Sequence, residues 1–169
     1  MFQDVFGLAN ISGKAAQPVS LAAQPVGFAA GRQGARERIQ QVRNGYKGEG
    51  HEVVVASEGF LLETDEDAWM EVNCLVLRDF KHDLDLVVYS QGANVDPHFI
   101  KVLQEGTPAD YPRRWSGYSK TVGEVVGQGW GVEPASWQEG TCGVSRKDII
   151  KAAATNLAGL YKRRLAQLA

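Results

Sequence analysis

Two arginines and one glutamate are the residues of this chain whose spacing points most directly to chemistry. Arg36 and Arg38 follow Gly34 in a run of good helix formers, and Glu58 follows the apolar run 53–56. Guanidinium groups bind phosphate through paired hydrogen bonds, and backbone amides at a glycine-led helix start favour the same anion. In open α/β sheets, ligands bind at the carboxyl ends of strands. We therefore expect Glu58 to end a strand beside a phosphate-binding helix start.

Glu58 has two interpretations at such a strand end. A carboxylate there binds Mg²⁺ or orients a hydrolytic water, which makes Glu58 the candidate catalytic and metal-binding residue. Alternatively, Glu58 forms a structural ion pair with an arginine. Arg36 and Arg38 likewise either bind phosphate or solvate the exposed face of an amphipathic helix.

Two further cations are candidates for binding the same anion. Lys14 follows Ser12 and Gly13 in a short loop, but a phosphate-binding P-loop has a longer glycine loop and a Ser or Thr after the lysine. Ala15 stands at that position. Arg146 lies at the start of the expected last helix, where it either points at an anion across a cleft or lies on the surface.

Arg113, Arg114 and Trp115 form a basic and aromatic group in a proline-containing segment. Core packing is the usual role of tryptophan. Aromatic side chains next to arginine are also enriched at protein–protein interfaces. These three residues are our candidate partner-binding residues.

Composition excludes several classes of protein. The chain has 169 residues and a net charge of −2, so no overall positive charge attracts nucleic acid or acidic membranes. No segment is apolar over the length of a membrane span. The three histidines are isolated and the two cysteines lack CxxC spacing, which argues against a zinc site and favours a cytosolic location.

Hydrophobic periodicity and turn residues predict the elements that must position these side chains. We expect strands over 5–11, 52–57 and 60–63, an extended loop over 15–30, a helix over 32–44, an antiparallel hairpin over 69–78 and 84–90, a helix over 97–104 capped by Asp96, an ordered loop over 107–118, a short helix over 121–126 ended by Gly127 and Gly129, and a long helix after Ser145 to about Leu168. This order predicts one α/β domain over residues 1–169, a three-layer sandwich with a mixed sheet.

Nearly the whole chain resembles the C-terminal domain of the proline-rich coiled-coil protein family. The matching segments are Phe2–Leu8, Gln24–Gly31, Gly34–Ile39, Trp115–Gly117, Thr121–Val125, Gly143–Arg146 and Ala158–Leu165. The resemblance implies an association with the early secretory pathway, at the cytosolic face of the Golgi or of endoplasmic reticulum exit sites. It also implies a protein partner, the regulatory subunit of protein kinase A.

That domain is in turn similar to the inosine/xanthosine triphosphatases, which hydrolyse non-canonical purine triphosphates with Mg²⁺. The similarity implies their fold, a purine nucleotide as ligand and a homodimer. It depends on Gln24–Gly27, Gly34–Arg38, Glu58–Gly59 and Gly143–Arg146. Those enzymes carry a phosphate loop and a helix after the first strand. Here the segment Ile11–Lys14 is the candidate for the loop, and Pro18 and Pro25 leave no room for the helix.

We therefore expect a binding or regulatory domain on a nucleoside triphosphatase-like scaffold, with catalysis reduced or lost and no cofactor. The alternative is a Mg²⁺-dependent triphosphatase acting on inosine or xanthosine triphosphate, with Glu58 at the metal and Arg38 and Arg146 at the phosphates. A nucleotide sensor that binds without cleavage is a third hypothesis. Because fold does not fix function, these expectations rest on analogy.

Overall fold

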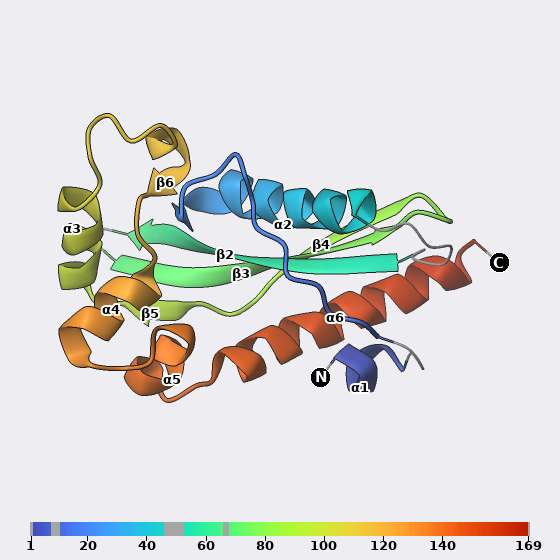
Figure 1. The fold of residues 1–169 in the computed structure, drawn as a ribbon. Helices are drawn as coiled ribbons and strands as arrows, with labels where there is room; N and C mark the ends of the chain where they lie inside the picture. Colours follow the sequence, from blue (N-terminus) through green and yellow to red (C-terminus); the bar gives the residue numbers. More distant parts are fainter. Residues whose placement is uncertain (1, 8–10, 46–52, 66–67, 169) are drawn as a thin grey trace.

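The computed structural model describes residues 2–7, 11–45, 53–65 and 68–168, and shows three layers. Helix α2 (Gly27–Asn44) covers one face of an antiparallel sheet, and helix α6 (Arg146–Ala166) crosses the other face (Figure 1). The structure confirms the α/β class and the three layers.

Two consecutive hairpins and one further short strand build the four-stranded sheet. Its strands are β2 (Val53–Asp65), β3 (Ala68–Asp79), β4 (Leu84–Tyr89) and β5 (Ala93–Val95). Strand β3 is central, because β2 pairs along one side of it and β4 and β5 pair in turn along the other. All three pairings are antiparallel, so our expectation of a mixed sheet is wrong for these strands. Successive hairpins contain no crossover that could make strands parallel.

Strand β2 runs through the glycine that we expected to end it. Glu58 pairs with Cys74 and Gly59 with Asn73, in the middle of the β2–β3 ladder. Gly59 is tolerated there because the Glu71 carboxylate fills the space where a side chain would lie: an added Cβ would be 2.9 Å from Glu71 Oε1. Glu58 therefore occupies a strand interior, and the prediction that it ends a strand is wrong.

Helix α2 approaches the sheet closely because two glycines face β2. A Cβ at Gly31 would lie 2.3 Å from the Phe60 ring, and one at Gly34 would lie 2.6 Å from Cγ of Glu58. Buried Ala35 and Ile39 continue the contact against β3. Both glycines are thus helix-interior packing residues, not the glycine-led helix start that we expected, and their amides are not at a free helix end.

On the opposite face, α6 packs its apolar side against the sheet. Ala153, Ala154, Leu157 and Ala158 contact a cluster that includes Leu75 and Leu77 of β3. Helix α1 (Phe2–Phe6) packs against α6. Residues 5 and 6 are therefore helical, and the predicted strand over 5–11 is wrong there; residues 8–10 lie outside the described part.

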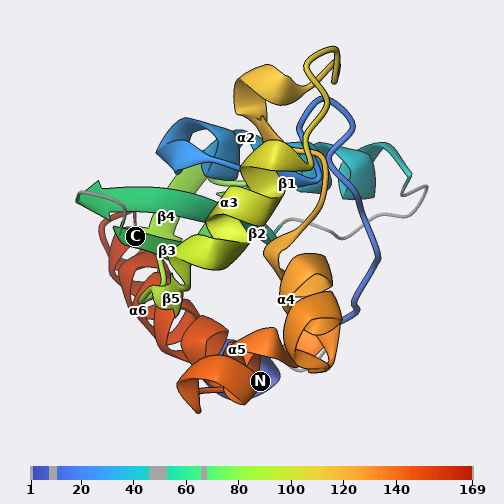
Figure 2. The same ribbon diagram turned by 90° about the vertical axis from the view of Figure 1, so that its left-hand side faces the viewer.

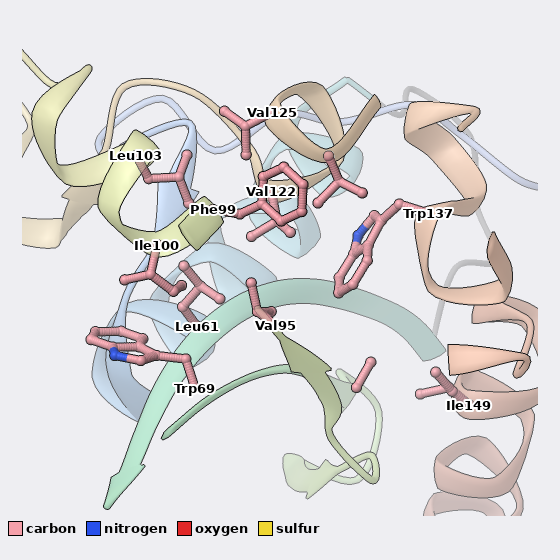
Figure 3. Close-up of a cluster of buried hydrophobic side chains, with 12 residues drawn as sticks. Leu61, Trp69, Val95, Phe99, Ile100, Leu103, Val122, Val125, Trp137 and Ile149 are labelled. Atoms are coloured by element: carbon pink, nitrogen blue, oxygen red, sulfur yellow. The ribbon is translucent and has the colours of Figure 1, made fainter. Parts of the chain in front are cut away.

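The remaining elements gather at one end of the sheet (Figure 2). They are α3 (Pro97–Glu105), the 3₁₀ turns η1 (Arg114–Ser116) and η2 (Pro134–Ser136), α4 (Val122–Trp130), α5 (Trp137–Cys142), and the short strands β1 (Gln24–Pro25) and β6 (Gly117–Tyr118). Their core contains Leu61, Phe99, Val122 and Trp137. In Figure 3, Trp69 closes this cluster on one side and Trp137 on the other.

Some helix ends lie where the sequence predicts them, and others lie at different residues. Asp96 caps α3 by accepting from His98 N, and the Ser145 side chain caps α6 by accepting from Asp148 N. Helix α2 begins at Gly27 rather than at residue 32. Helix α4 continues through both Gly127 and Gly129, and α5 was not predicted. Among the described residues, no helix is long and apolar enough to cross a membrane.

Candidate functional site

The Glu58 carboxylate is buried beneath helix α2 and paired with Arg38. The Nε atom of Arg38 donates to Glu58 Oε2 at 2.5 Å, and only 7% of the Glu58 side chain is exposed. Alternation along β2 points Glu58 toward α2, where the missing side chain of Gly34 leaves room for it. The structure therefore brings together two predicted site residues, in the ion pair that was the structural alternative for Glu58.

Arg38 has a second partner, in the irregular segment 11–23 that we call the strap. The Arg38 guanidinium also donates to the backbone carbonyl of Ala16. The strap runs across the edge of the sheet between α1 and β1 (Figure 1). Arg38 thus joins three parts of the fold: the strap, α2 and β2.

Polar side chains of α2 hold the strap along several residues. Gln41 accepts from Gln17 N and donates to the Gln17 carbonyl, and Glu37 accepts from the backbone amides of Val19 and Ser20. The Ser20 hydroxyl also donates to Glu37. These bonds satisfy backbone groups of a segment that has no strand partner along this stretch. The strap is consequently fixed over the Arg38–Glu58 pair.

A second buried carboxylate, Glu71, lies on the opposite face of the sheet. Glu71 pairs with Leu61 in the β2–β3 ladder, and its Oε2 accepts from Gln138 Nε2 of α5 at 2.5 Å. Arg146, at the start of α6, is exposed. A Cβ added at Gly59 would lie 2.9 Å from Glu71 Oε1 and 3.6 Å from Arg146 Nη2. Arg146 therefore lies next to β2 on the Glu71 side of the sheet. The charge of Arg146 acts on both carboxylates.

Burial has the largest effect on the pKa of both glutamates, and it raises both values. It raises the pKa of Glu58, although the hydrogen bond and charge of Arg38 and the charge of Arg146 oppose the increase. Burial also raises the pKa of Glu71, against the charge of Arg146 and the Gln138 hydrogen bond. The charge of Glu58 additionally raises the pKa of Glu71, and the charge of Glu37 raises the pKa of Glu58. The surrounding groups stabilise the charged forms only in part.

Two predicted phosphate ligands lie elsewhere. Arg36 Nη2 pairs with Asp85 Oδ2 of β4 at 2.8 Å, on an exposed surface. Lys14 Nζ lies 3.4 Å from the carbonyl of Gly45, beyond the C-terminal end of α2. Gly34, which contacts Glu58, is about three turns of helix away from Gly45. Arg36 and Lys14 therefore do not share a phosphate site with Arg38.

The predicted partner-binding residues lie together on an exposed surface. Arg114 and Trp115 belong to η1, Arg113 precedes it, and 67% of Trp115 is exposed. Ser116, which follows, is buried and accepts from Ala22 N through its hydroxyl. A fixed turn thus presents Trp115 to solvent, which excludes the core-packing interpretation for this tryptophan.

Sequence reasoning missed Glu71 and Gln138. Glu71 interrupts the otherwise apolar run of β3, and charged residues are almost never fully buried without a partner. That interruption was the available signal. Gln138 gave none, because the helix that carries it was not predicted.

The fit of Mg²⁺ to these residues is poor. Glu58 Oε2 faces the Arg38 guanidinium, and alternation along β2 and β3 directs Glu58 and Glu71 to opposite faces of the sheet. Magnesium requires near-octahedral oxygen ligands, usually from one or two carboxylates together with water and substrate phosphates. Within the described residues, no group of three or more His, Cys, Asp or Glu side chains is placed to hold a metal ion.

Comparison with solved structures shows a likeness in fold. No family model matches the chain. Among solved structures, the chain is similar to the crystal structure of protein VC0702 from Vibrio cholerae, with a TM-score of 0.62 and 16% sequence identity. The similarity covers 91% of this chain and 80% of VC0702. At this identity, the likeness extends to the arrangement of helices and strands and no further.

Proposed function

We propose that the chain is a binding or regulatory domain on a nucleoside triphosphatase-like scaffold, in which the carboxylate expected to catalyse has a structural role. The observation that carries this proposal is the Arg38–Glu58 pair at 2.5 Å beneath the strap. A base or metal ligand needs free lone pairs directed at substrate, whereas Glu58 faces an arginine that also binds Ala16. Lys14 and Arg36 lie apart from this pair, which supports the same conclusion.

We propose that Arg113, Arg114 and Trp115 bind a protein partner. Interface energy is concentrated in a few residues, and tryptophan and arginine are prominent among them. Trp115 is exposed on a turn whose backbone is fixed by the buried Ser116. The resemblance to the C-terminal domain of proline-rich coiled-coil proteins makes the regulatory subunit of protein kinase A the partner to test, and the cytosolic face of the early secretory pathway the place.

Capture by immobilised regulatory subunit tests this proposal. We expect Trp115→Ala to weaken capture by roughly tenfold or more, as for an interface hot spot. The double variant Arg113→Ala/Arg114→Ala should weaken it and reduce its dependence on salt. Arg163→Ala/Arg164→Ala removes a matched exposed pair from α6 and should leave capture unchanged. Equal capture of the Trp115→Ala variant, or no capture of the wild type, would overturn this partner assignment.

One observation favours the triphosphatase or nucleotide-sensor alternative. Arg146 is exposed near two buried carboxylates, where it could meet an anionic ligand at the edge of β2. A ligand that binds only the folded state raises the melting temperature. If inosine triphosphate stabilises the wild type and Arg146→Ala abolishes the effect, the sensor hypothesis is supported. Absence of stabilisation in the wild type would remove it.

A further inference from the structure

A cavity lies at the end of the molecule away from the Arg38–Glu58 pair, between β5, α3, α4 and α5. Its volume is about 290 Å³. The lining residues are Asn94, Val95, Asp96, Phe99, Val126, Trp130, Trp137, Thr141 and Cys142. We call it the Trp130 pocket. None of its residues belongs to the proposed partner surface.

Aromatic rings form the walls of the Trp130 pocket. The rings of Phe99 and Trp130 stand nearly perpendicular, with centroids 4.8 Å apart and an interplanar angle of 77°. Phe99 and Trp137 are buried, whereas 53% of Trp130 is exposed. The pocket thus has a fixed floor and one indole wall that solvent and a ligand can reach. Ring faces carry the negative part of the aromatic quadrupole, which attracts cations.

The N-terminus of α3 brings a partial positive charge to the pocket, and the other charged groups there are negative. Asp96 is the one charged side chain among the residues that line it. Its Oδ1 accepts from His98 N as the N-cap of α3, so the negative charge offsets the positive end of that helix. Trp130 and Cys142 are the last residues of α4 and α5, so the negative ends of two helix dipoles also lie at the pocket.

The remaining polar groups do not change this balance. Cys142 Sγ donates to the Asn94 carbonyl at 3.7 Å, and the Thr141 hydroxyl donates to the Trp137 carbonyl at 3.0 Å. Both side chains therefore have local partners. Asn94 also lines the cavity, so the cavity offers a ligand aromatic surface, a neutral amide and the negative charge of Asp96.

We propose that the Trp130 pocket binds an alkylammonium group, the indole of Trp130 stacking over the cation and the Asp96 carboxylate balancing its charge. Cavities of this size accept a small molecule or a single side chain. An ammonium with methyl groups buries apolar surface against Phe99 and Trp137 while its charge faces the negative groups. The same chemistry is found in a free amine of the choline type and in a methylated lysine of a protein, and binding experiments separate the two sources.

Isothermal titration calorimetry with choline tests the proposal, with 3,3-dimethyl-1-butanol as the neutral molecule of the same shape. We expect choline to bind roughly tenfold more tightly than the alcohol, the size of a moderate cation–π effect. Trp130→Ala should abolish measurable choline binding, and Trp130→Phe should retain part of it. Equal affinity for both compounds, or no choline binding at millimolar concentration, would overturn the proposal.

A charge-matched pair of variants separates the role of Asp96 from its role as a helix cap. Asn caps a helix as well as Asp does, so Asp96→Asn keeps α3 intact while it removes the charge. We expect this variant to weaken choline binding several-fold, whereas Glu105→Gln, at the far end of the same helix, leaves it unchanged. Identical affinities in both variants would contradict the role of Asp96. Tighter binding of a peptide containing trimethyllysine than of choline would identify a protein as the source of the cation.

Discussion

Gly34 of α2 and Glu58 of β2 are so close that no other residue type fits at position 34 without a shift. An added Cβ would lie 2.6 Å from Cγ and 2.9 Å from Cδ of Glu58. The glycine allows the helix to cover the carboxylate and to place Arg38 over it one turn later. The glycine and the arginine that suggested a phosphate site thus act together to bury an ion pair.

Gly34→Ala should destabilise the fold, because the new methyl group forces Glu58 to move within a packed layer. We expect a loss of roughly 1–3 kcal/mol in the free energy of unfolding, measured by urea denaturation. Gly159→Ala on the exposed face of α6 is the control, since nothing lies within 4 Å of its added Cβ. That variant should gain up to about 1 kcal/mol from helix propensity. Equal effects of the two substitutions would contradict the close contact.

The Arg38–Glu58 pair should be strongly coupled in a double-mutant cycle. Removing one partner of a buried pair leaves the other charge uncompensated. The stability losses of the single variants Arg38→Met and Glu58→Gln should therefore add up to more than the loss in the double variant. We expect a coupling free energy of about 1–3 kcal/mol from urea denaturation. Additivity within about 0.3 kcal/mol would show that the pair does not stabilise the fold.

The strap should loosen when its anchor on α2 is removed. Glu37 accepts from Val19 N and Ser20 N, so these amides are expected to exchange slowly with deuterium in the wild type. Glu37→Ala should speed their exchange at least tenfold while the amides of α6 are unaffected. Unchanged exchange at both positions would mean that the strap is held by other contacts.

Asp79 should make stability depend on pH in acid. Although burial raises its pKa, hydrogen bonds from Tyr161, from the His82 side chain and from the backbone amides of His82 and Lys81 outweigh burial and lower the pKa from 3.8 to about 2. Because the pKa of Asp79 is lower in the folded state than in the unfolded chain, the folded state is stabilised at pH values above the unfolded pKa. For this shift the stabilisation is about 2 kcal/mol. This stabilisation is lost as the pH falls from about 5 to 2.

Comparison of the wild type with Asp79→Asn isolates this contribution. The wild type should be more stable at pH 7, and the difference should shrink as the pH falls toward 2, as measured by urea denaturation at a series of pH values. A difference that stays constant over this range would contradict the lowered pKa of Asp79.

The sequence predicted those elements whose signals are local. Asp96 and Pro97 mark the start of α3, and Ser145 marks the start of α6, because a side-chain cap needs only the residues next to it. The hairpin of β3 and β4 follows from its apolar runs. Glycines were harder to interpret. Gly59 continues a strand and Gly129 continues a helix because Glu71 and Phe99, distant in sequence, occupy the space that their side chains would take.

The candidate site was predicted only in part for the same reason. Arg38 and Glu58 do lie together on the α2 side of β2, whereas Arg146 lies next to Gly59 on the Glu71 side. Whether a carboxylate faces substrate or an arginine depends on how α2 crosses the sheet, and that crossing is decided by the packing of Gly31 and Gly34. Glu71 and Gln138 meet across 67 residues of sequence, which no local pattern indicates.

Release of phosphate or pyrophosphate from inosine triphosphate, xanthosine triphosphate and GTP with Mg²⁺ tests the structural role of Glu58 most directly. The wild type and Glu58→Gln should both release product at the rate of a protein-free control, while the variant is less stable to urea. Turnover by the wild type that disappears in a folded Glu58→Gln protein would contradict this account, and would make Glu58 a catalytic residue.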